Sequence, residues 1–247
     1  MPEMNPLKPK LQILVISLEK SLSRREQAAV ELAKTNLNWR FLDAVDGRKL
    51  SYPIAEYPAN KVKRLLGFEL TPNEIGCFLS HRAAWQQCVE NQTATLVFED
   101  DFLLLPHFEH CVEQLLNHPN DWQIVRLQAL LETPSDKLKS FDQFDLVQNH
   151  ADPLGATAYL IQPASAKILI EFSQQIYEPL DHFLEHHAKH GQVTLAAKPY
   201  PVDITKVVST IADRPNDRKP IKGFAKNIRS FYRWFDRTFS KDPWFPK

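Results

Sequence analysis

Residues 11–18 (LQILVISL) form a short apolar run that is rich in Leu, Ile and Val and predicts a buried strand. Residues 24–34 (RREQAAVELAK) follow with apolar side chains at helical spacing, and residues 39–43 (WRFLD) predict a second short strand. A strand, a helix and a strand in this order indicate a βαβ unit, from which parallel sheets are built. We therefore expect an α/β fold.

The middle of the chain continues this alternation of strands and helices. Thr71, Pro72 and Glu74 predict a helix start, with a capping threonine, a proline suited to the first helical position and a glutamate that closes a capping box. We expect this helix to run to about Glu90. Further strands are predicted at residues 95–98, 122–127 and 156–161, and a further helix at residues 165–172. The sheet should therefore be mostly parallel.

The composition argues against several classes of protein. The 247-residue chain has 30 basic and 30 acidic side chains, and this balance argues against a nucleic-acid binder. Its six glycines form neither G-x-G-x-x-G nor a P-loop pattern, which argues against a dinucleotide site and a P-loop. Three cysteines are too few for a disulfide framework, and no apolar run is long enough to span a bilayer. We expect a cytoplasmic protein.

Three adjacent carboxylates, Glu99, Asp100 and Asp101, follow the strand predicted at residues 95–98. Open α/β sheets bind ligands at the carboxyl ends of their strands, and carboxylates beside an apolar strand need a compensating cation or donors. In an extended segment, Glu99 and Asp101 point to the same side and can share one hard cation, whereas Asp100 points elsewhere. The alternative is a solvated acidic turn.

Five segments between residues 15 and 181 carry recognisable motifs. They are VISL at 15–18 with the arginine pair at 24–25, DAVDG at 43–47, EIGCFLSH at 74–81 with Trp85, VFEDD at 97–101, and GATAYLI at 155–161 with PLD at 179–181. In this order they resemble glycosyltransferase family 25, which contains bacterial lipooligosaccharide glycosyltransferases related to the collagen galactosyltransferases. Family members often carry Pro-Val-Asp where this chain has Pro-Leu-Asp. After about residue 185 the resemblance is weak.

The resemblance implies a GT-A-type, Rossmann-like domain over residues 1–213 that binds a nucleotide sugar. It implies an inverting, metal-dependent hexosyltransferase that uses UDP-galactose or UDP-glucose to extend a bacterial lipooligosaccharide or lipopolysaccharide. Glu99 and Asp101 would hold Mn²⁺ or Mg²⁺, because oxygen ligands suit these cations. The cation would stabilise the negative charge that develops on the leaving diphosphate.

The resemblance also implies roles for the other site residues. Asp181 is the expected general base for the acceptor hydroxyl, and the alternative is an N-cap for the helix that follows. Arg25 is expected to bind the diphosphate, and the alternative is an exposed helix arginine. For His81 the alternative is a partly buried histidine bonded to a carboxylate. The expected donor-binding residues are Ser17, Leu18, Arg25, Asp43, Ala44, Asp46, Ser80, His81, Asp100, Gly155 and Ala156.

A different reaction class is indicated by the pattern H-x-x-E-H at residues 182–186. On a continuous helix, His182 and His186 share one face and can bind zinc beside Glu185, as in a zinc hydrolase. Surface histidines are the alternative. Arg126, which follows a buried strand, is a candidate for an ion pair with Glu99 or Asp100.

The charge is divided unevenly along the chain. Residues 214–247 contain 10 Lys or Arg and 3 Asp or Glu, a net charge of +7, which leaves −7 on residues 1–213. Residues 224–239 predict a helix with phenylalanines on one face and basic residues on the other. We expect residues 222–239 to bind an anionic membrane surface and to place the protein on the inner face of the cytoplasmic membrane. The alternative for this helix is packing on the protein's own core. For the whole protein, a non-enzymatic, membrane-surface glycan-binding adaptor is an alternative to the enzyme.

Overall fold

The computed structural model describes residues 10–205, so the predicted basic tail at 214–247 and its helix lie outside the described residues. The strands are β1 (Leu11–Ser17), β2 (Arg40–Asp43), β3 (Ala94–Glu99), β4 (Phe102–Leu104), β5 (Ile124–Arg126), β6 (Ser135–Ser140), β7 (Asp145–Asn149), β8 (Ala158–Ile161), β9 (Thr194–Lys198) and β10 (Val202–Ile204). The α-helices are α1 (Leu22–Leu32), α2 (Ala59–Leu66), α3 (Pro72–Asn91), α4 (Phe108–Asn117), α5 (Pro163–Phe172), α6 (Leu180–Glu185) and α7 (His187–His190), and two 3₁₀ turns are η1 (Gly47–Lys49) and η2 (Pro119–Asp121).

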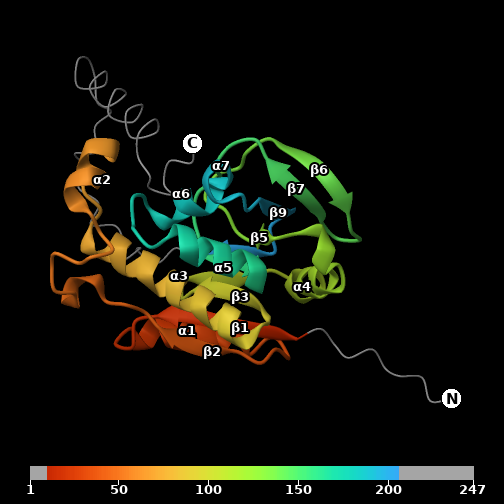
Figure 1. Ribbon diagram of the computed structural model, residues 1–247. Coiled ribbons are helices and arrows are strands. Elements are labelled where there is room, and N and C mark those ends of the chain that lie inside the picture. Colours follow the sequence, from red (N-terminus) through yellow and green to blue (C-terminus); the bar gives the residue numbers. More distant parts are fainter. Residues whose placement is uncertain (1–9, 206–247) are drawn as a thin grey trace.

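The central sheet has eight strands in the order β2-β1-β3-β8-β5-β9-β7-β6, and β4 pairs separately with β10 (Figure 1). Only β7 and β8 run opposite to the other six described strands of this sheet, which confirms the predicted α/β fold with a mostly parallel sheet. The predicted βαβ unit is present, because β1 is parallel to β2 and places Ser17 beside Asp43. β1 is also parallel to β3, with Ile16 beside Glu99. The carboxyl ends of β1, β2 and β3 therefore meet at one edge of the sheet.

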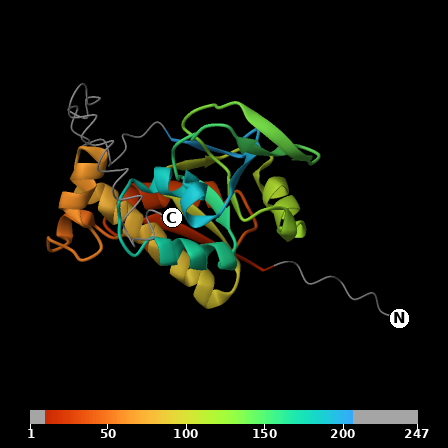
Figure 2. The same cartoon turned by 45° about the horizontal axis from the view of Figure 1, so that its top comes forward.

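Helices cover both faces of this sheet (Figures 1 and 2). Side chains that alternate along β1 divide between the two cores, as the pleat of a strand requires. Leu14 and Ile16 pack in the cluster that contains residues of α2, α3, α5 and α6. Ile13 and Val15 pack in the cluster that contains residues of α1 and α4. Both faces of β1 are thus buried, which explains why its sequence is an apolar run.

Helix α3 begins with the capping box that the sequence predicts. The Thr71 hydroxyl accepts a hydrogen bond from the Glu74 amide at 3.2 Å, and the Glu74 carboxylate accepts one from the Thr71 amide at 2.8 Å. One turn later, Gly76 packs against the loop after β2: a Cβ at Gly76 would lie 2.5 Å from the Val45 carbonyl oxygen and 2.7 Å from the Gly47 nitrogen. The absence of a side chain at Gly76 therefore lets α3 approach the edge where β1, β2 and β3 end.

The second half of the sheet departs from simple βαβ repeats. Helix α4 lies between β3 and β5 in the chain, and these two strands run in the same direction. Between β5 and β8 the described chain instead forms the hairpin β6–β7. Parallel pairing of neighbouring strands needs a crossover, usually a helix. Without one, β8 enters between β3 and β5 in the opposite direction.

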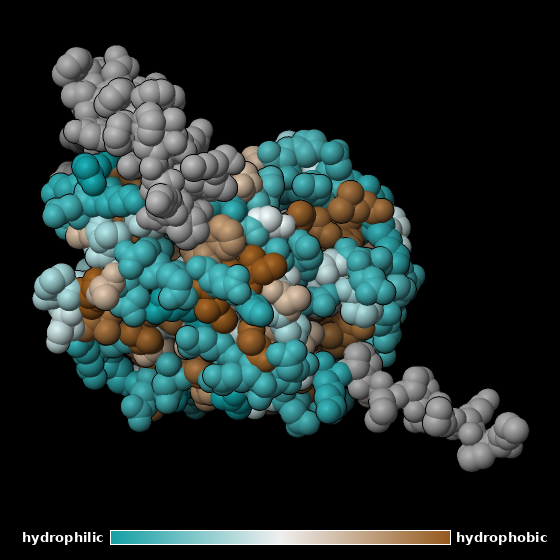
Figure 3. Space-filling model, viewed as in Figure 1, coloured by the Kyte–Doolittle hydropathy of each residue, from teal (hydrophilic) through white to brown (hydrophobic). Residues whose placement is uncertain are grey.

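Apolar residues are scattered over a largely hydrophilic surface, and one group of them lies over the β6–β7 hairpin (Figure 3). Leu138 on β6, and Leu130 and Leu131 before it, are each about half exposed. Among residues 10–205, no helix is long and apolar enough to cross a membrane.

Candidate active site

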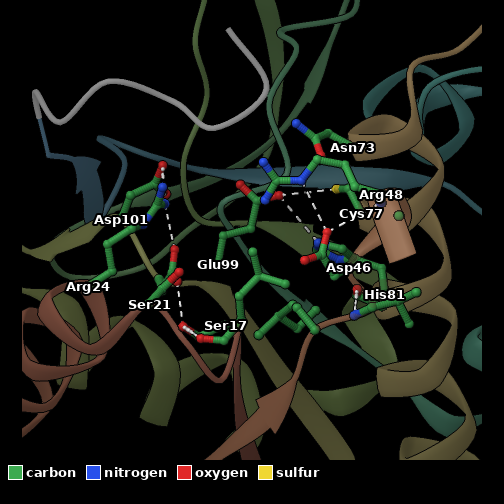
Figure 4. A pocket seen from close by; sticks show the side chains of 17 residues that line it. Ser17, Ser21, Arg24, Asp46, Arg48, Asn73, Cys77, His81, Glu99 and Asp101 are labelled. Carbon is green, nitrogen blue, oxygen red and sulfur yellow. Dashed lines mark hydrogen bonds and ion pairs between the residues drawn. The ribbon is translucent and has the colours of Figure 1, made fainter. Parts of the chain in front are cut away.

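A pocket lies at the edge where β1, β2 and β3 end (Figure 4). Its walls come from four places: the end of β1 with the start of α1, the turn after β2, the first turns of α3, and the acidic turn after β3. The residues that line it are Ile16, Ser17, Leu18, Ser21, Arg24, Ala44, Val45, Asp46, Gly47, Arg48, Asn73, Cys77, Ser80, His81, Glu99, Asp100 and Asp101.

The acidic segment turns sharply instead of continuing as an extended strand. β3 ends at Glu99, and Asp100 and Asp101 form the turn into β4. Both aspartates contact the guanidinium of Arg24, at 2.5 Å from Asp100 Oδ1 and 3.1 Å from Asp101 Oδ2. Asp100 also accepts a hydrogen bond from the Ser17 hydroxyl at 2.5 Å. The predicted alternation of the three side chains is therefore wrong, because it assumed extended backbone through Asp101.

Asp101 is held in an environment that opposes its charge. Burial, together with the charges of Glu99 and Asp100, raises the pKa of Asp101 to about 7, although Arg24 acts in the opposite direction. Its Oδ1 atom is buried and has no hydrogen-bond partner among the described residues. A buried carboxylate oxygen without a donor, beside further carboxylates, fits a hard divalent cation such as Mn²⁺ or Mg²⁺.

Glu99 faces α3, on the other side of the pocket from Arg24 (Figure 4). Its carboxylate lies 3.4 Å from His81 Nε2 and accepts a hydrogen bond from the Cys77 thiol at 3.5 Å. Burial opposes ionisation here, yet the contact with His81 keeps the pKa of Glu99 below its ordinary value. The alternative reading of His81, a buried histidine beside a carboxylate, therefore describes its environment in this structure.

The loop after β2 brings more charge to the pocket. The Asp46 carboxylate contacts Lys20 at 2.5 Å and Arg48 at 3.2 Å. The hydrogen bond from Lys20, with help from Arg48, lowers the pKa of Asp46 to about 2. Ser80 fixes this loop to α3, since its hydroxyl accepts from the Val45 amide at 2.8 Å and donates to the Gly76 carbonyl at 2.6 Å.

The structure brings nine of the expected site residues into the pocket lining. These nine are Ser17, Leu18, Ala44, Asp46, Ser80, His81, Glu99, Asp100 and Asp101. The other five, Arg25, Asp43, Gly155, Ala156 and Asp181, lie outside that lining. Ala156 and Gly155 precede Thr157, whose carbonyl accepts from the Glu99 amide at 2.8 Å.

Arg25 has contacts that differ from the expected diphosphate role. Its guanidinium donates to the Ser17 carbonyl at 2.9 Å, pairs with Asp43 and lies 4.7 Å from the centre of the Phe41 ring. These contacts tie α1 to β1 and β2. Of these two adjacent arginines, the one that lines the pocket is Arg24, which sequence reasoning missed.

Cys77 was also missed as a candidate, although a signal was available. It lies four residues before His81, a spacing that places two side chains on the same face of a helix. The other pocket residues that the sequence did not single out are Ser21, Arg48 and Asn73.

Asp181 lies in the first turn of α6, one residue after the helix begins. The N-cap of α6 is Pro179, so the alternative of an Asp181 cap is wrong. Burial raises the pKa of the Cys77 thiol well above its ordinary value, and the charge of Asp181 adds to this after that of Glu99.

The H-x-x-E-H pattern does not form a metal site. Helix α6 ends at Glu185, so His186 lies past the helix end and the two histidines do not share one helical face. Each member has its own partner: His182 lies 3.0 Å from Asp152, His186 lies 3.0 Å from Glu178, and Glu185 lies 2.6 Å from Arg126. The zinc-hydrolase hypothesis is therefore wrong. The expected pairing of Arg126 with Glu99 or Asp100 is wrong as well.

Proteins with open α/β sheets bind ligands at the carboxyl ends of the strands, and the acidic turn of this chain lies at that edge. The chain belongs to glycosyltransferase family 25 (LPS biosynthesis protein), whose model matches residues 10–184. This result confirms the resemblance seen in the sequence motifs.

The names of relatives within this family differ: one calls its protein probably inactive, and others name a biosynthesis protein and a galactosyltransferase. The chain is 26% identical to the probable inactive glycosyltransferase 25 family member 3 of Rattus norvegicus over 94% of this chain and 41% of the rat protein. It is 27% identical to the lipooligosaccharide biosynthesis protein lic2B of Haemophilus influenzae over 63% of this chain and 60% of that protein. It is 28% identical to human procollagen galactosyltransferase 2 over 46% of this chain and 20% of that protein.

The chain thus spans about two fifths of the length of the rat relative. Among solved structures, it is similar to a glycosyltransferase involved in the glycosylation of the major capsid of PBCV-1, with a TM-score of 0.39 and 11% identity over 78% of this chain and 84% of that one.

Proposed function

We propose that the chain is an active, inverting glycosyltransferase that moves a hexose from a UDP-sugar to a lipooligosaccharide or lipopolysaccharide acceptor. Galactose is the proposed sugar, because the relatives include a procollagen galactosyltransferase. The acceptor is proposed from the relative lic2B, which is named for lipooligosaccharide biosynthesis. The observation that carries the proposal is the buried acidic turn with Arg24 inside the pocket.

The pocket is suited to the charge changes of sugar transfer. When the bond between the anomeric carbon and the diphosphate breaks, negative charge develops on the leaving phosphate oxygens. Arg24 is a pocket-lining cation whose guanidinium can donate to a phosphate in a charge-assisted hydrogen bond. Glu99 and Asp101 are proposed to hold Mn²⁺ or Mg²⁺ between them, with Asp101 turned from Arg24 toward Glu99, and the bound ion would stabilise that charge electrostatically.

Transfer with inversion also needs a group that takes the proton of the acceptor hydroxyl. The hydroxyl oxygen forms the new bond to the anomeric carbon on the side opposite the diphosphate, and its proton passes to the base. Asp181 is our proposal for this base. Support comes from its place in the family motif at residues 179–181.

Several mammalian relatives carry names that call them inactive, so we base the proposed activity of this chain on its own pocket. Burying carboxylates that repel one another destabilises a fold. The raised pKa of Asp101 and its unpartnered Oδ1 atom reflect this destabilisation. Within the described part of the chain, Arg24 offsets it only partly. Buried charge that the protein alone does not fully compensate is typical of a site that binds a charged ligand.

The experiment is incubation of the purified full-length protein with a panel of UDP-sugars, Mn²⁺ and lipooligosaccharide acceptors, followed by mass spectrometry of the acceptor. We expect one UDP-hexose to add one hexose, and we expect Asp101→Asn to abolish this product. Asp136→Asn is the matched control, because Asp136 is an exposed aspartate on β6 away from the pocket. No product and no UDP release with any donor would contradict the proposal.

The same experiment separates the enzyme from an adaptor. A non-enzymatic glycan-binding adaptor would bind acceptor glycan without turnover and would keep this binding in the Asp101→Asn variant. Peripheral attachment to an anionic membrane through residues 222–239 remains part of the proposal and rests on the sequence of that segment alone.

A further inference from the structure

Three potential metal ligands of different chemistry meet on the α3 side of the pocket. Cys77 and His81 lie one helical turn apart on α3, and Glu99 ends β3 opposite them (Figure 4). We propose that these three side chains form a binding site for a thiophilic divalent cation, with Zn²⁺ as its reference ion. This site has a different ligand set from the oxygen-only site proposed for Mn²⁺ or Mg²⁺.

Two of the three distances between the ligand atoms match those of a tetrahedral zinc ion. Usual zinc bond lengths place a sulfur and an oxygen ligand about 3.6 Å apart, and a nitrogen and an oxygen ligand about 3.4 Å apart. In the structure, Cys77 Sγ lies 3.5 Å from Glu99 Oε1, and His81 Nε2 lies 3.4 Å from the same oxygen. All three ligand atoms lie within 4.8 Å of one another. Small shifts of these side chains are therefore enough for coordination.

His81 is already oriented for this role. Its ring is fully buried, and its Nε2 atom, which faces Glu99, has no hydrogen-bond partner among residues 10–205. Its other nitrogen, Nδ1, lies 2.9 Å from the Tyr159 hydroxyl. Trp85 in turn donates its indole N–H to that hydroxyl at 2.8 Å. Metal-binding histidines are characteristically held through their second nitrogen in this way.

The Tyr159 oxygen has two lone pairs, so it can accept from both Trp85 and a His81 ring that is protonated at Nδ1. The Nε2 proton that favours the Glu99 carboxylate in the metal-free site is lost when the cation binds, and the Nε2 lone pair then becomes the ligand. Binding of the cation displaces the proton of the Cys77 thiol, which is released to solvent. All three ligands line the pocket.

The ligand set determines which cations compete. A thiolate and an imidazole favour zinc over magnesium or manganese, which prefer oxygen ligands. A zinc ion at Cys77, His81 and Glu99 removes Glu99 from the oxygen-only site. We therefore expect Zn²⁺ to inhibit sugar transfer and excess Mn²⁺ to relieve this inhibition only in part. This consequence rests on the proposed function, whereas the binding of the cation does not.

The direct test is titration of untagged, full-length protein with Co²⁺, a spectroscopic substitute for zinc. We expect one equivalent to bind with a sulfur-to-cobalt charge-transfer absorption, and Zn²⁺ to abolish this absorption by displacement. Cys77→Ser should remove the band and weaken Zn²⁺ binding at least tenfold. Cys111→Ala is the matched control: Cys111 is buried on α4 and should keep the band.

A second measurement uses the wild-type protein and does not depend on a variant that folds. Cys77 is partly accessible, whereas Cys88 and Cys111 are buried, so a thiol reagent should modify Cys77 first. One equivalent of Zn²⁺ should slow this modification at least tenfold. A missing cobalt–sulfur band, a band that persists in Cys77→Ser, or an unchanged rate of modification would each overturn the site. Zinc binding without sugar transfer from any donor would instead reject the proposed function and leave the site standing.

Discussion

At Asp101, burial and two neighbouring carboxylates oppose ionisation, and the contact with Arg24 offsets only part of this effect. The pKa of about 7 in the folded protein lies above the ordinary value of 3.8. The folded state therefore holds the proton more tightly than the unfolded state does. The resulting stabilisation is fully present below pH 4 and is lost as the pH rises through 7.

This sign gives a test by chemical denaturation in the presence of EDTA. The free energy of unfolding of Asp101→Asn minus that of wild type should increase by about 1–4 kcal/mol between pH 5 and pH 8. The reason is that the amide carries no charge to be destabilised at high pH. Asp136→Asn should show no such trend. An equal difference at both pH values would mean that Asp101 is not held in this way.

The two adjacent arginines separate two roles. Arg24→Met should raise the KM for the UDP-sugar about ten- to a hundredfold, because a hydrogen bond between charged groups contributes about 1.5–3 kcal/mol. Arg25→Met should instead lower the melting temperature and leave the KM within about threefold, because Arg25 is bound to Ser17, Asp43 and Phe41. Steady-state kinetics and thermal melts of both variants measure this. The reverse pattern would restore Arg25 as the diphosphate ligand.

The same residues show where sequence reasoning reaches its limit. The acidic motif could be located because its residue types and its position after a strand are visible in the sequence. The choice between Arg24 and Arg25 could not be made, since it depends on the angle at which α1 leaves β1. The direction of Asp101 also depended on a turn, and no glycine or proline within the motif signals that turn.

Among the elements, α3 forms one wall of the site, because it presents Cys77, Ser80 and His81 to the pocket. Its start was predictable from a local signal, the capping box at Thr71 and Glu74. The hairpin β6–β7 and the antiparallel entry of β8 were not predicted. The pairings of β8 with β3 and β5 join segments far apart in the chain, and the periodicity of one segment does not identify its neighbour. β6 (SDKLKS) is mostly polar, so its sequence gives little sign of a strand.

The close approach of α3 to the loop after β2 predicts that a side chain at Gly76 destabilises the fold. Gly76→Ala should lower the free energy of unfolding by about 1–3 kcal/mol, because the added methyl group would meet backbone atoms of Val45 and Gly47. Urea denaturation measures this loss. Gln86→Ala, at an exposed position on the same helix, should change it by less than about 0.5 kcal/mol. A Gly76→Ala variant as stable as wild type would mean that α3 does not need this contact.

Across the whole molecule, two parts of the sequence carry opposite net charges. Residues 1–213 carry a net charge of −7 and residues 214–247 carry +7. A basic side chain near an anionic membrane contributes about 1 kcal/mol of binding energy. The proposed glycolipid acceptor would lie at such a surface, so attachment there would concentrate the proposed transferase beside it.

The expected outcome concerns vesicles that contain anionic lipid. Replacing Lys222, Lys226, Arg229, Arg233 and Arg237 by Gln should abolish co-sedimentation with these vesicles and spare transfer to a short water-soluble acceptor. Binding of the wild type should weaken steeply with salt, because exposed charges are screened over about 8–10 Å. Unchanged sedimentation of the variant would reject the membrane role of the tail.

We propose that the pocket at the ends of β1, β2 and β3 binds the nucleotide part of a sugar donor. Calorimetric titration of UDP into the full-length protein, with and without Mn²⁺, tests it most directly because it needs no acceptor. We predict one binding site that requires Mn²⁺, is lost in Asp101→Asn and persists in Asp136→Asn. Absence of UDP binding, or UDP binding that both variants retain without Mn²⁺, would contradict the claim.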